Sequence, residues 1–181
     1  MPYAQIRPVL FLVGLMTFAA SIMAQFATQG VALFLRAEET SSGTIGLIYL
    51  AVIPYTLRFL WAPLVDRSGL GGQGRYARWL IVTQIACALA IAAMGLVDPA
   101  SAPLAIIAIL AVFMVSAGTQ QTALGGLMTA SVPAEHYPKV TSIQGISSGL
   151  AGFILGAAVL YFLAEIGWQA AITALTIISL A

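Results

Sequence analysis

One stretch, residues 54–78, holds most of the side chains that could take part in chemical interactions. It carries Arg58 inside an apolar segment, Asp66 and Arg67 at the end of that segment, a glycine-rich turn, and then Arg75 and Arg78. These arginines are four of the seven basic residues in a chain that is otherwise nearly free of charge. Side chains of opposite charge at this spacing offer ion pairing rather than bond making, so we look to electrostatics for the role of this stretch.

The side chains that enzymes use for covalent or acid–base chemistry form no constellation in the sequence. There is no Ser/His/Asp set, no pair of carboxylates inside an apolar segment and no cysteine cluster, because Cys87 is the only cysteine. The one histidine, His136, lies in a proline-flanked loop, where we expect it to be solvated. Residues 69–74 spell G-x-G-x-x-G, but a dinucleotide site needs a strand before that turn. We predict no enzyme, no cofactor and no metal.

The composition places the chain in the membrane-protein class. Its 181 residues are 61% hydrophobic and 7% charged, whereas soluble domains contain about 25% charged residues. A soluble domain of this size still exposes much of its surface and could not hide so much apolar area. The apolar segments are continuous rather than alternating, which favours spanning helices over a barrel. The formal net charge of +1 gives no indication of nucleic-acid binding.

Six apolar segments predict an all-α, multi-pass transmembrane bundle. We place the spans at about residues 8–35, 44–65, 79–97, 104–132, 140–163 and 168–181, in one domain covering 1–181. The first is long and ends in no clear cleavage site, so we interpret it as a helix rather than a signal peptide. The last offers about 21 Å of helix at 1.5 Å per residue, against a hydrocarbon core of about 30 Å. We therefore expect a truncated sixth helix.

The distribution of basic residues predicts the orientation in the membrane. Cytoplasmic loops carry an excess of Lys and Arg. With a cytoplasmic N-terminus, the inner loops hold Arg7, Arg67, Arg75, Arg78 and Lys139, and the outer loops hold only Arg36 among the basic residues. The sequence therefore predicts a cytoplasmic N-terminus.

Polar side chains inside two of the predicted spans indicate a solute pathway. Gln25 and Thr28 lie on one polar face of span 8–35, and Gln120 and Gln121 lie near the middle of span 104–132. An amide within the membrane needs several hydrogen-bond partners, and a wet cavity supplies them. The alternative is contact between helices, which contributes about 0.6–2 kcal/mol for such side chains.

We predict that these four residues face the pathway, with Tyr55 and Arg58 as further contributors. Charges inside a membrane are functional candidates by default. For Arg58 the alternative is snorkelling to the nearby cytoplasmic surface.

Glycines form one face of the fifth predicted span. Gly145, Gly149, Gly152 and Gly156 follow one another at helical spacings. Small residues in this pattern let two membrane helices approach closely. We predict a helix-packing seam, whose partner helix could come from another part of a larger assembly.

The charged stretch resembles a known family pattern. Asp66-Arg67, with the small residue Ala62 four positions before the aspartate and Gly69 and more arginines after it, resembles the signature loop between helices 2 and 3 of the major facilitator superfamily. The longer run FLWAPLVDR, together with Thr119-Gln120 and Gly167-Trp168, resembles AmpG-type muropeptide permeases and the allied siderophore and acetyl-CoA permeases. The resemblance covers most of the chain.

This resemblance implies a fold and a function. The fold would be the N-terminal six-helix half of a twelve-helix permease, with a solute site between two halves near the midplane of the membrane. The function would be import of a small amphiphilic solute, such as a muropeptide or a siderophore, by alternating access across the bacterial cytoplasmic (inner) membrane. The implied partners are the lipid bilayer, the solute and a second six-helix half, from the same gene or a separate chain.

The family's loop pattern also implies a cytoplasmic gate made of Asp66, Arg67, Arg75 and Arg78. A carboxylate gains from the dipole of a helix N-terminus, and ion pairs at a gate can form and break with state. One departure is Gln121, which stands where relatives usually carry an acidic residue, and it puts proton coupling at this position in doubt. The alternative function is a six-helix membrane interaction or assembly subunit that transports nothing.

Overall fold

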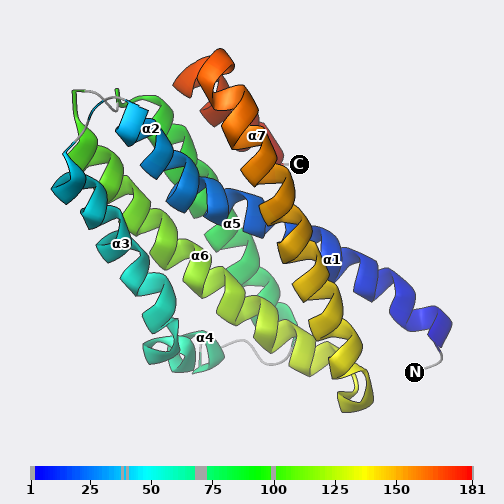
Figure 1. The fold of residues 1–181 in the computed structure, drawn as a ribbon. Helices are drawn as coiled ribbons and strands as arrows, with labels where there is room; N and C mark the ends of the chain where they lie inside the picture. The colour runs from blue at the N-terminus through cyan, green and yellow to red at the C-terminus, as the bar shows by residue number, and fades with distance from the viewer. Residues whose placement is uncertain (1–2, 38, 40, 68–72, 99–100, 181) are drawn as a thin grey trace.

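The structure, a computed structural model, describes residues 3–180 with gaps at 38, 40, 68–72 and 99–100. Side chains are described except within 3–6, 9, 37, 73, 155–166 and 178–180. In the described part of the chain every element is helical, and short turns join the helices (Figure 1). This arrangement confirms the predicted all-α class.

The first membrane segment is a long helix with one irregular turn. α1 (Tyr3–Gln25) passes through the π-helical turn η1 (Phe26–Gly30) into α2 (Val31–Ala37). A Cβ at Gly30 would lie 2.7 Å from the ring of Phe26, so the turn keeps its shape only with glycine there. Such π-helical turns are rare and frequently lie at functional sites.

The second segment bends near its C-terminal end. α3 (Ser42–Thr56) is followed by the 3₁₀ turn η2 (Leu57–Leu60) and by α4 (Ala62–Arg67). The Ser41 hydroxyl caps α3 by accepting the N–H of Thr44 at 3.3 Å. Pro63 has no N–H to donate to the carbonyl of Phe59, so the α-helical ladder cannot run unbroken through the bend.

The remaining helices are α5 (Gln73–Gly95), α6 (Pro103–Ser131), the short 3₁₀ turn η3 (Ala134–His136) and α7 (Tyr137–Leu180). α7 is interrupted at Gly167, where φ is 78° and ψ is 166°. Beyond this residue the chain turns back along the bundle (Figure 1). α7 is therefore two helices joined at a glycine, which lies between the predicted spans 140–163 and 168–181.

Four helical segments among the described residues are long and apolar enough to cross a membrane. They are Leu10–Arg36, Ser42–Leu60, Gly74–Gly95 and Pro103–Ser131. Each coincides with one of the first four predicted spans to within about a turn and a half. The predicted spans 140–163 and 168–181 both fall within α7, and their membrane crossing stays a prediction.

The helices pack side by side around a shared apolar centre. α6 lies between α3 and α5, while α7 packs against both α1 and α5 (Figure 1). The core includes fully buried Leu110, Phe113 and Met114 of α6 and Met23 of α1. Many large apolar side chains point outwards instead, among them Phe153, which is 78% exposed. Apolar surface of this kind suits a lipid environment rather than water.

Candidate functional site

The charged stretch folds into a compact cluster that joins two helices. Asp66 ends α4, and Tyr76 lies in the first turn of α5. The Tyr76 hydroxyl donates to Oδ1 of Asp66 at 3.0 Å, and the Arg75 guanidinium donates to the backbone carbonyl of Asp66. The same guanidinium lies over the Tyr76 ring, 5.1 Å from its centre. Asp66 and Arg75, two of the predicted gate residues, are thus brought together.

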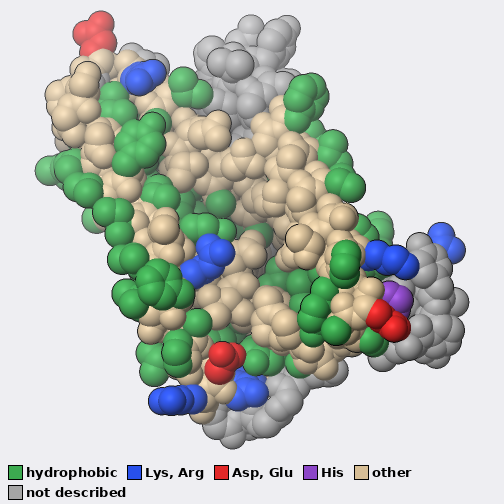
Figure 2. All heavy atoms as spheres, turned by 60° about the horizontal axis from the view of Figure 1, so that its bottom comes forward, with side chains coloured by type: hydrophobic (Ala, Val, Ile, Leu, Met, Phe, Trp, Pro, Cys, Tyr) green, Lys and Arg blue, Asp and Glu red, His purple; other side chains and the backbone are tan. Residues whose placement is uncertain are grey.

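The other two predicted gate residues take no part in these hydrogen bonds. Arg67 and Arg78 are both exposed, and neither forms an ion pair with a carboxylate of the described residues. Acidic and basic side chains sit close together near the lower edge of the face in Figure 2. The arrangement leaves two guanidinium groups accessible beside a structured carboxylate, and the gate itself stays a prediction.

Tyr76 is anchored against α6. Its side chain is 9% exposed, and a Cβ at Gly126 would lie 2.2 Å from its ring. Glycine at this position is therefore what lets the ring lie flat against the helix. The buried ring fixes the hydroxyl that binds Asp66, so the charged cluster has a rigid base.

The bend of the second segment crosses α6 at close range. Trp61 Nε1 donates to Thr119 Oγ1 at 3.0 Å. A Cβ at Gly118 would lie 3.3 Å from Cβ of Arg58 and 3.4 Å from Cα of Tyr55. The small residue therefore permits the close crossing, while the indole hydrogen bond fixes its position.

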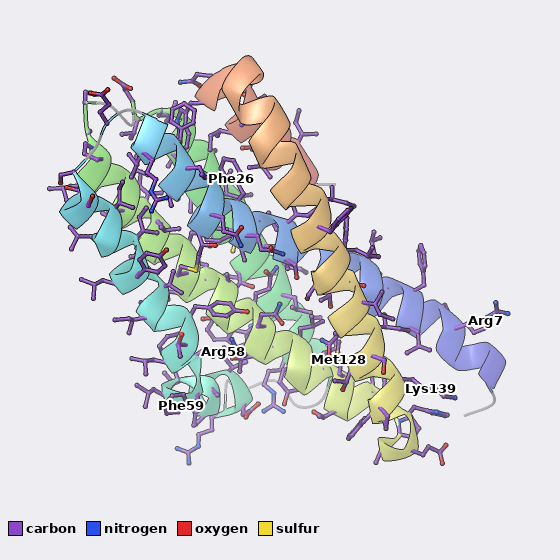
Figure 3. The ribbon with its side chains drawn as sticks, in the orientation of Figure 1. Arg7, Phe26, Arg58, Phe59, Met128 and Lys139 are labelled. Carbon is purple, nitrogen blue, oxygen red and sulfur yellow. The ribbon has the colours of Figure 1, made fainter. Side chains whose placement is uncertain are left out.

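Two of the predicted pathway residues, Tyr55 and Arg58, lie at this crossing. The Arg58 guanidinium stands over the Tyr55 ring, 4.7 Å from its centre. Figure 3 labels Arg58 between the lower end of α3 and α6. Both side chains are half-buried, and no carboxylate among the described residues forms an ion pair with Arg58.

The two glutamines of α6 have different surroundings. Gln120 is 6% exposed and donates to Oε1 of Gln84, which joins α6 to α5. Gln121 is half-buried and makes no hydrogen bond to a described residue. The surroundings of Gln120 match the alternative of contact between helices, whereas Gln121 keeps a free amide. The pathway assignment of both residues stays a prediction.

Gln25 and Thr28 differ in their hydrogen-bond partners, because Gln25 contacts α7 and Thr28 bonds within its own helical segment. Gln25 Nε2 donates to the carbonyl of Ser148 at 3.4 Å, next to the 2.9 Å hydrogen bond between Ser21 and Ser148. Thr28 Oγ1 donates to the carbonyl of Ala24, within its own helical segment, at 3.0 Å. The Gln25 contact also matches the interhelical alternative, and the pathway role of both residues stays a prediction.

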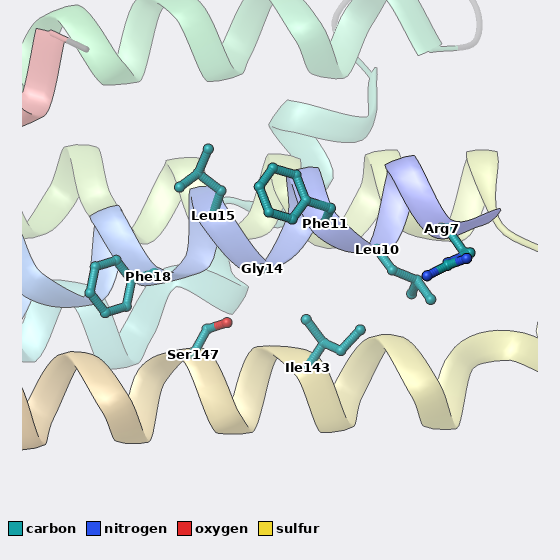
Figure 4. A pocket seen from close by; sticks show the side chains of 8 residues that line it. All are labelled: Arg7, Leu10, Phe11, Gly14, Leu15, Phe18, Ile143 and Ser147. Carbon is teal, nitrogen blue, oxygen red and sulfur yellow. The ribbon is translucent and has the colours of Figure 1, made fainter. Parts of the chain in front are cut away.

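An open groove of about 480 Å³ runs between α1 and α7. Its lining is mostly apolar, with Arg7 at one end and Ser147 facing Gly14 across the middle (Figure 4). None of the six predicted pathway residues belongs to this lining. The role of those six residues in a pathway stays a prediction.

The four glycines of the predicted packing seam differ in how closely other residues approach their Cβ positions. A Cβ at Gly152 would lie 2.8 Å from Oε1 of Gln25, so this glycine packs against α1. Gly145 and Gly149 have nothing within 4 Å of such an atom. Gly156 lies among the residues whose side-chain surroundings are not described. The seam as a whole stays a prediction.

Sequence reasoning missed Tyr76, Gln84, Trp61 and Ser148, each the partner of a residue that it singled out. Tyr76 directly follows Arg75, and its phenol could have been considered for the cluster on position alone. The other three gave weak signals, because an isolated polar side chain in an apolar segment does not reveal which helix it faces. Among the described residues, no group of three or more His, Cys, Asp or Glu could hold a metal ion.

Comparison with known proteins gives several relatives. Residues 9–115 match the family described as acetyl-coenzyme A transporter 1. Over 153 residues the chain is 28% identical to the anhydromuropeptide permease of Escherichia coli K12, covering 84% of this chain and 31% of that protein. It is also 28% identical over 144 residues to an uncharacterised protein of Haemophilus influenzae, covering 78% of this chain and 33% of that protein.

A shorter match joins the chain to an uncharacterised membrane protein of Saccharomyces cerevisiae, with 34% identity over 59 residues, 33% of this chain and 10% of that protein. The chain spans about a third of the length of the two bacterial relatives it matches. The family match takes in α3, the bend, the charged cluster and the first part of α6. Because this match covers more than half of the 181 residues, the chain belongs to the acetyl-coenzyme A transporter 1 family, among the permeases of the major facilitator type.

Proposed function

We propose that this chain forms one bundle of a secondary active transporter that imports a small amphiphilic solute by alternating access. The observation that carries the proposal is the similarity over 84% of the chain to a protein named as an anhydromuropeptide permease. A muropeptide-like or siderophore-like compound is the proposed solute. Such a role involves binding and movement rather than catalysis, in agreement with the absence of a catalytic constellation from the sequence.

Asp66, Arg67, Arg75 and Arg78 are the proposed cytoplasmic gate. Oδ1 of Asp66 accepts the Tyr76 hydroxyl, while no described residue donates to its second carboxylate oxygen. The exposed arginines and this oxygen are therefore available to a facing segment in one state of the cycle. Charge-assisted hydrogen bonds are strong enough to hold such a state, and they break without covalent change.

A second six-helix bundle, from the same gene or a separate chain, is the proposed partner. Gly145 and Gly149 of α7 are open, and beside them Ile146 and Leu150 are 62% and 52% exposed. A glycine-lined apolar face supports close approach of another membrane helix. The proposed location is the bacterial cytoplasmic membrane with the N-terminus inside.

Uptake by the protein expressed from its complete gene tests the proposal. Cells lacking their own muropeptide uptake should accumulate labelled anhydromuropeptide when they produce the parent protein. Asp66→Asn should reduce the initial rate at least about tenfold, because a lost charged hydrogen bond corresponds to about 1.5–3 kcal/mol. Glu39→Gln removes another exposed carboxylate and should behave like the parent. Absence of uptake of both muropeptide and siderophore probes by the parent would refute the proposed solute class.

A further inference from the structure

We infer that Arg58 recognises the transported solute by binding an anionic group on it, a carboxylate or a phosphate. The inference rests on the proposed transport function and deepens it by naming a feature that the solute must carry. The observations behind it are the position of Arg58 in a candidate membrane span, the contacts that hold its guanidinium group, and the polar side chains on the facing part of α6.

Arg58 is the only charged residue in the candidate span Ser42–Leu60. It stands two residues before the end of that span, and the bend and α4 separate it from Asp66. An unpaired charge within a membrane is costly, so such residues face a wet cavity or a partner of opposite charge. No carboxylate among the described residues provides that partner. An anionic ligand would provide that partner.

The direction of the side chain argues against snorkelling. A snorkelling arginine at this position would extend past α4 towards the charged loop. Instead the guanidinium lies over the ring of Tyr55, one turn further from that loop. Helical side chains lean towards the N-terminus of their own helix, so the bend itself favours this direction. The charge is therefore directed back along the span, away from α4.

The guanidinium is also held in place. The Tyr55 ring covers one of its faces at 4.7 Å. Gly118 allows the backbone under Arg58 to lie directly on α6, and the hydrogen bond from Trp61 to Thr119 fixes the next turn. An arginine whose guanidinium group has a fixed orientation loses little conformational entropy on binding a carboxylate or a phosphate. It can bind either group with two parallel hydrogen bonds.

The same face of α6 offers further polar groups. Gln121 and Thr122 lie three and four residues after Gly118, so they share the face that meets Arg58. Both are half-buried. The Gln121 amide makes no hydrogen bond to a described residue and is free to donate to the solute. A guanidinium group and an amide group on two facing helices can bind an anionic group and a carbonyl of one solute.

Binding of simple anions to the detergent-purified full protein tests the site without knowledge of the solute. The tryptophan emission of the parent, titrated with inorganic phosphate and with acetate at constant ionic strength, should change saturably, because Trp61 lies one turn from Arg58. Arg58→Gln should weaken the binding about ten- to hundredfold, with Arg58→Lys in between. Arg36→Gln, which removes an exposed arginine elsewhere, should bind like the parent. An unchanged affinity in Arg58→Gln, or no saturable change in the parent, overturns the inference.

Uptake of paired probes then separates the anion site from the proposed transport. The parent should import anhydromuropeptide with free carboxylates about ten- to hundredfold faster than its methyl ester, and Arg58→Gln should lose that preference. Equal uptake of both forms by the parent overturns the role of Arg58 while transport stands. If the parent binds phosphate through Arg58 but imports neither probe, the anion site is supported and the proposed solute class fails.

A lipid headgroup is the other source of a phosphate. In nanodiscs of phosphatidylcholine, the addition of phosphatidylglycerol should leave the affinity for inorganic phosphate unchanged if Arg58 faces the solute pathway. Competition between phosphatidylglycerol and phosphate that disappears in Arg58→Gln would assign the site to a lipid headgroup and overturn the inference.

Discussion

The hydroxyl of Tyr76 donates a 3.0 Å hydrogen bond to Oδ1 of Asp66 and so ties the end of α4 to the first turn of α5. The neighbouring Arg75 binds the backbone carbonyl of the same aspartate. The end of α4 and the first turn of α5 are therefore held together by their own residues. The aspartate of the proposed gate is positioned before any other segment approaches it.

Tyr76→Phe should lower the free energy of unfolding by about 1 kcal/mol. A hydrogen bond to a charged group contributes about 1.5–3 kcal/mol, and the exposure of Asp66 reduces that figure through solvent screening. Denaturant titration of the purified protein measures the change. Asp66→Asn and the double variant complete a cycle whose coupling should be about 0.5–1 kcal/mol. Additive effects of the two substitutions would show that the hydrogen bond does not contribute.

Gly126→Ala should destabilise the protein by about 1–3 kcal/mol, as overpacking of a filled contact does. The added methyl would lie 2.2 Å from the Tyr76 ring, and the ring would have to move away from Asp66. The adjacent Gly125 has nothing within 4 Å of its own Cβ position, so Gly125→Ala is a matched control. It should leave the stability unchanged or raise it slightly, because alanine favours helix over glycine. Equal losses in both variants would contradict the described packing.

The sequence could predict the helices and the charged loop because both depend on the types and spacing of residues that are close together in the chain. Apolar segments of about 20 residues leave few alternatives to a spanning helix. The interval between the predicted spans 140–163 and 168–181 contains Gly167, where the structure interrupts α7. These features depend on residues near one another in the chain, so composition and spacing suffice to find them.

Pairings between helices could not be predicted, because they depend on how each helix is rotated about its axis. Gln120 and Gln84 are both amides in apolar segments, and nothing in the sequence says that they meet. The same holds for Trp61 and Thr119. The π-helical turn at Phe26–Gly30 was also missed, because its residues fit a regular helix equally well.

In a double-mutant cycle of Trp61→Phe and Thr119→Val, the coupling free energy of unfolding should be about 0.6 kcal/mol and at most about 1.7 kcal/mol. This is the range measured for hydrogen bonds between membrane helices. Unfolding in mixed detergent micelles measures each variant. Thr119→Ser keeps the hydroxyl that accepts from the indole, so it should retain most of the coupling. Loss of the coupling in Thr119→Ser would assign the effect to packing of the methyl group instead.

The orientation in the membrane can be tested with single cysteines. Cys87 is buried, and Cys87→Ala, together with replacement of every cysteine outside residues 1–181, gives a background without thiols. In that background, a membrane-impermeant maleimide added to intact cells should label Ser101→Cys and should not label Glu135→Cys until the cells are opened. Both positions are exposed in the structure, so access is decided by the side of the membrane. The reverse pattern would invert the predicted topology.

Gly167→Ala should cost about 1–3 kcal/mol, because φ of 78° with ψ of 166° lies in a region that only glycine occupies without strain. The turn cannot relax freely, since the next residue is anchored. Trp168 is 6% exposed, its indole N–H donates to the carbonyl of Met94 at 3.2 Å, and its ring centre lies 4.9 Å from that of Phe34. Any shift of the backbone at 167 must loosen these contacts.

Gly46→Ala provides the comparison for this last substitution. Gly46 lies within α3, is exposed and has open space at its Cβ position, so the substitution should be neutral or slightly stabilising. Denaturant titration gives the stability of both variants, and near-UV circular dichroism reports the packing of Trp168. A Gly167→Ala variant as stable as Gly46→Ala would mean that the helix can continue through residue 167 without loss. In that case the turn would not be fixed by the backbone, and the contacts of Trp168 alone would have to hold it.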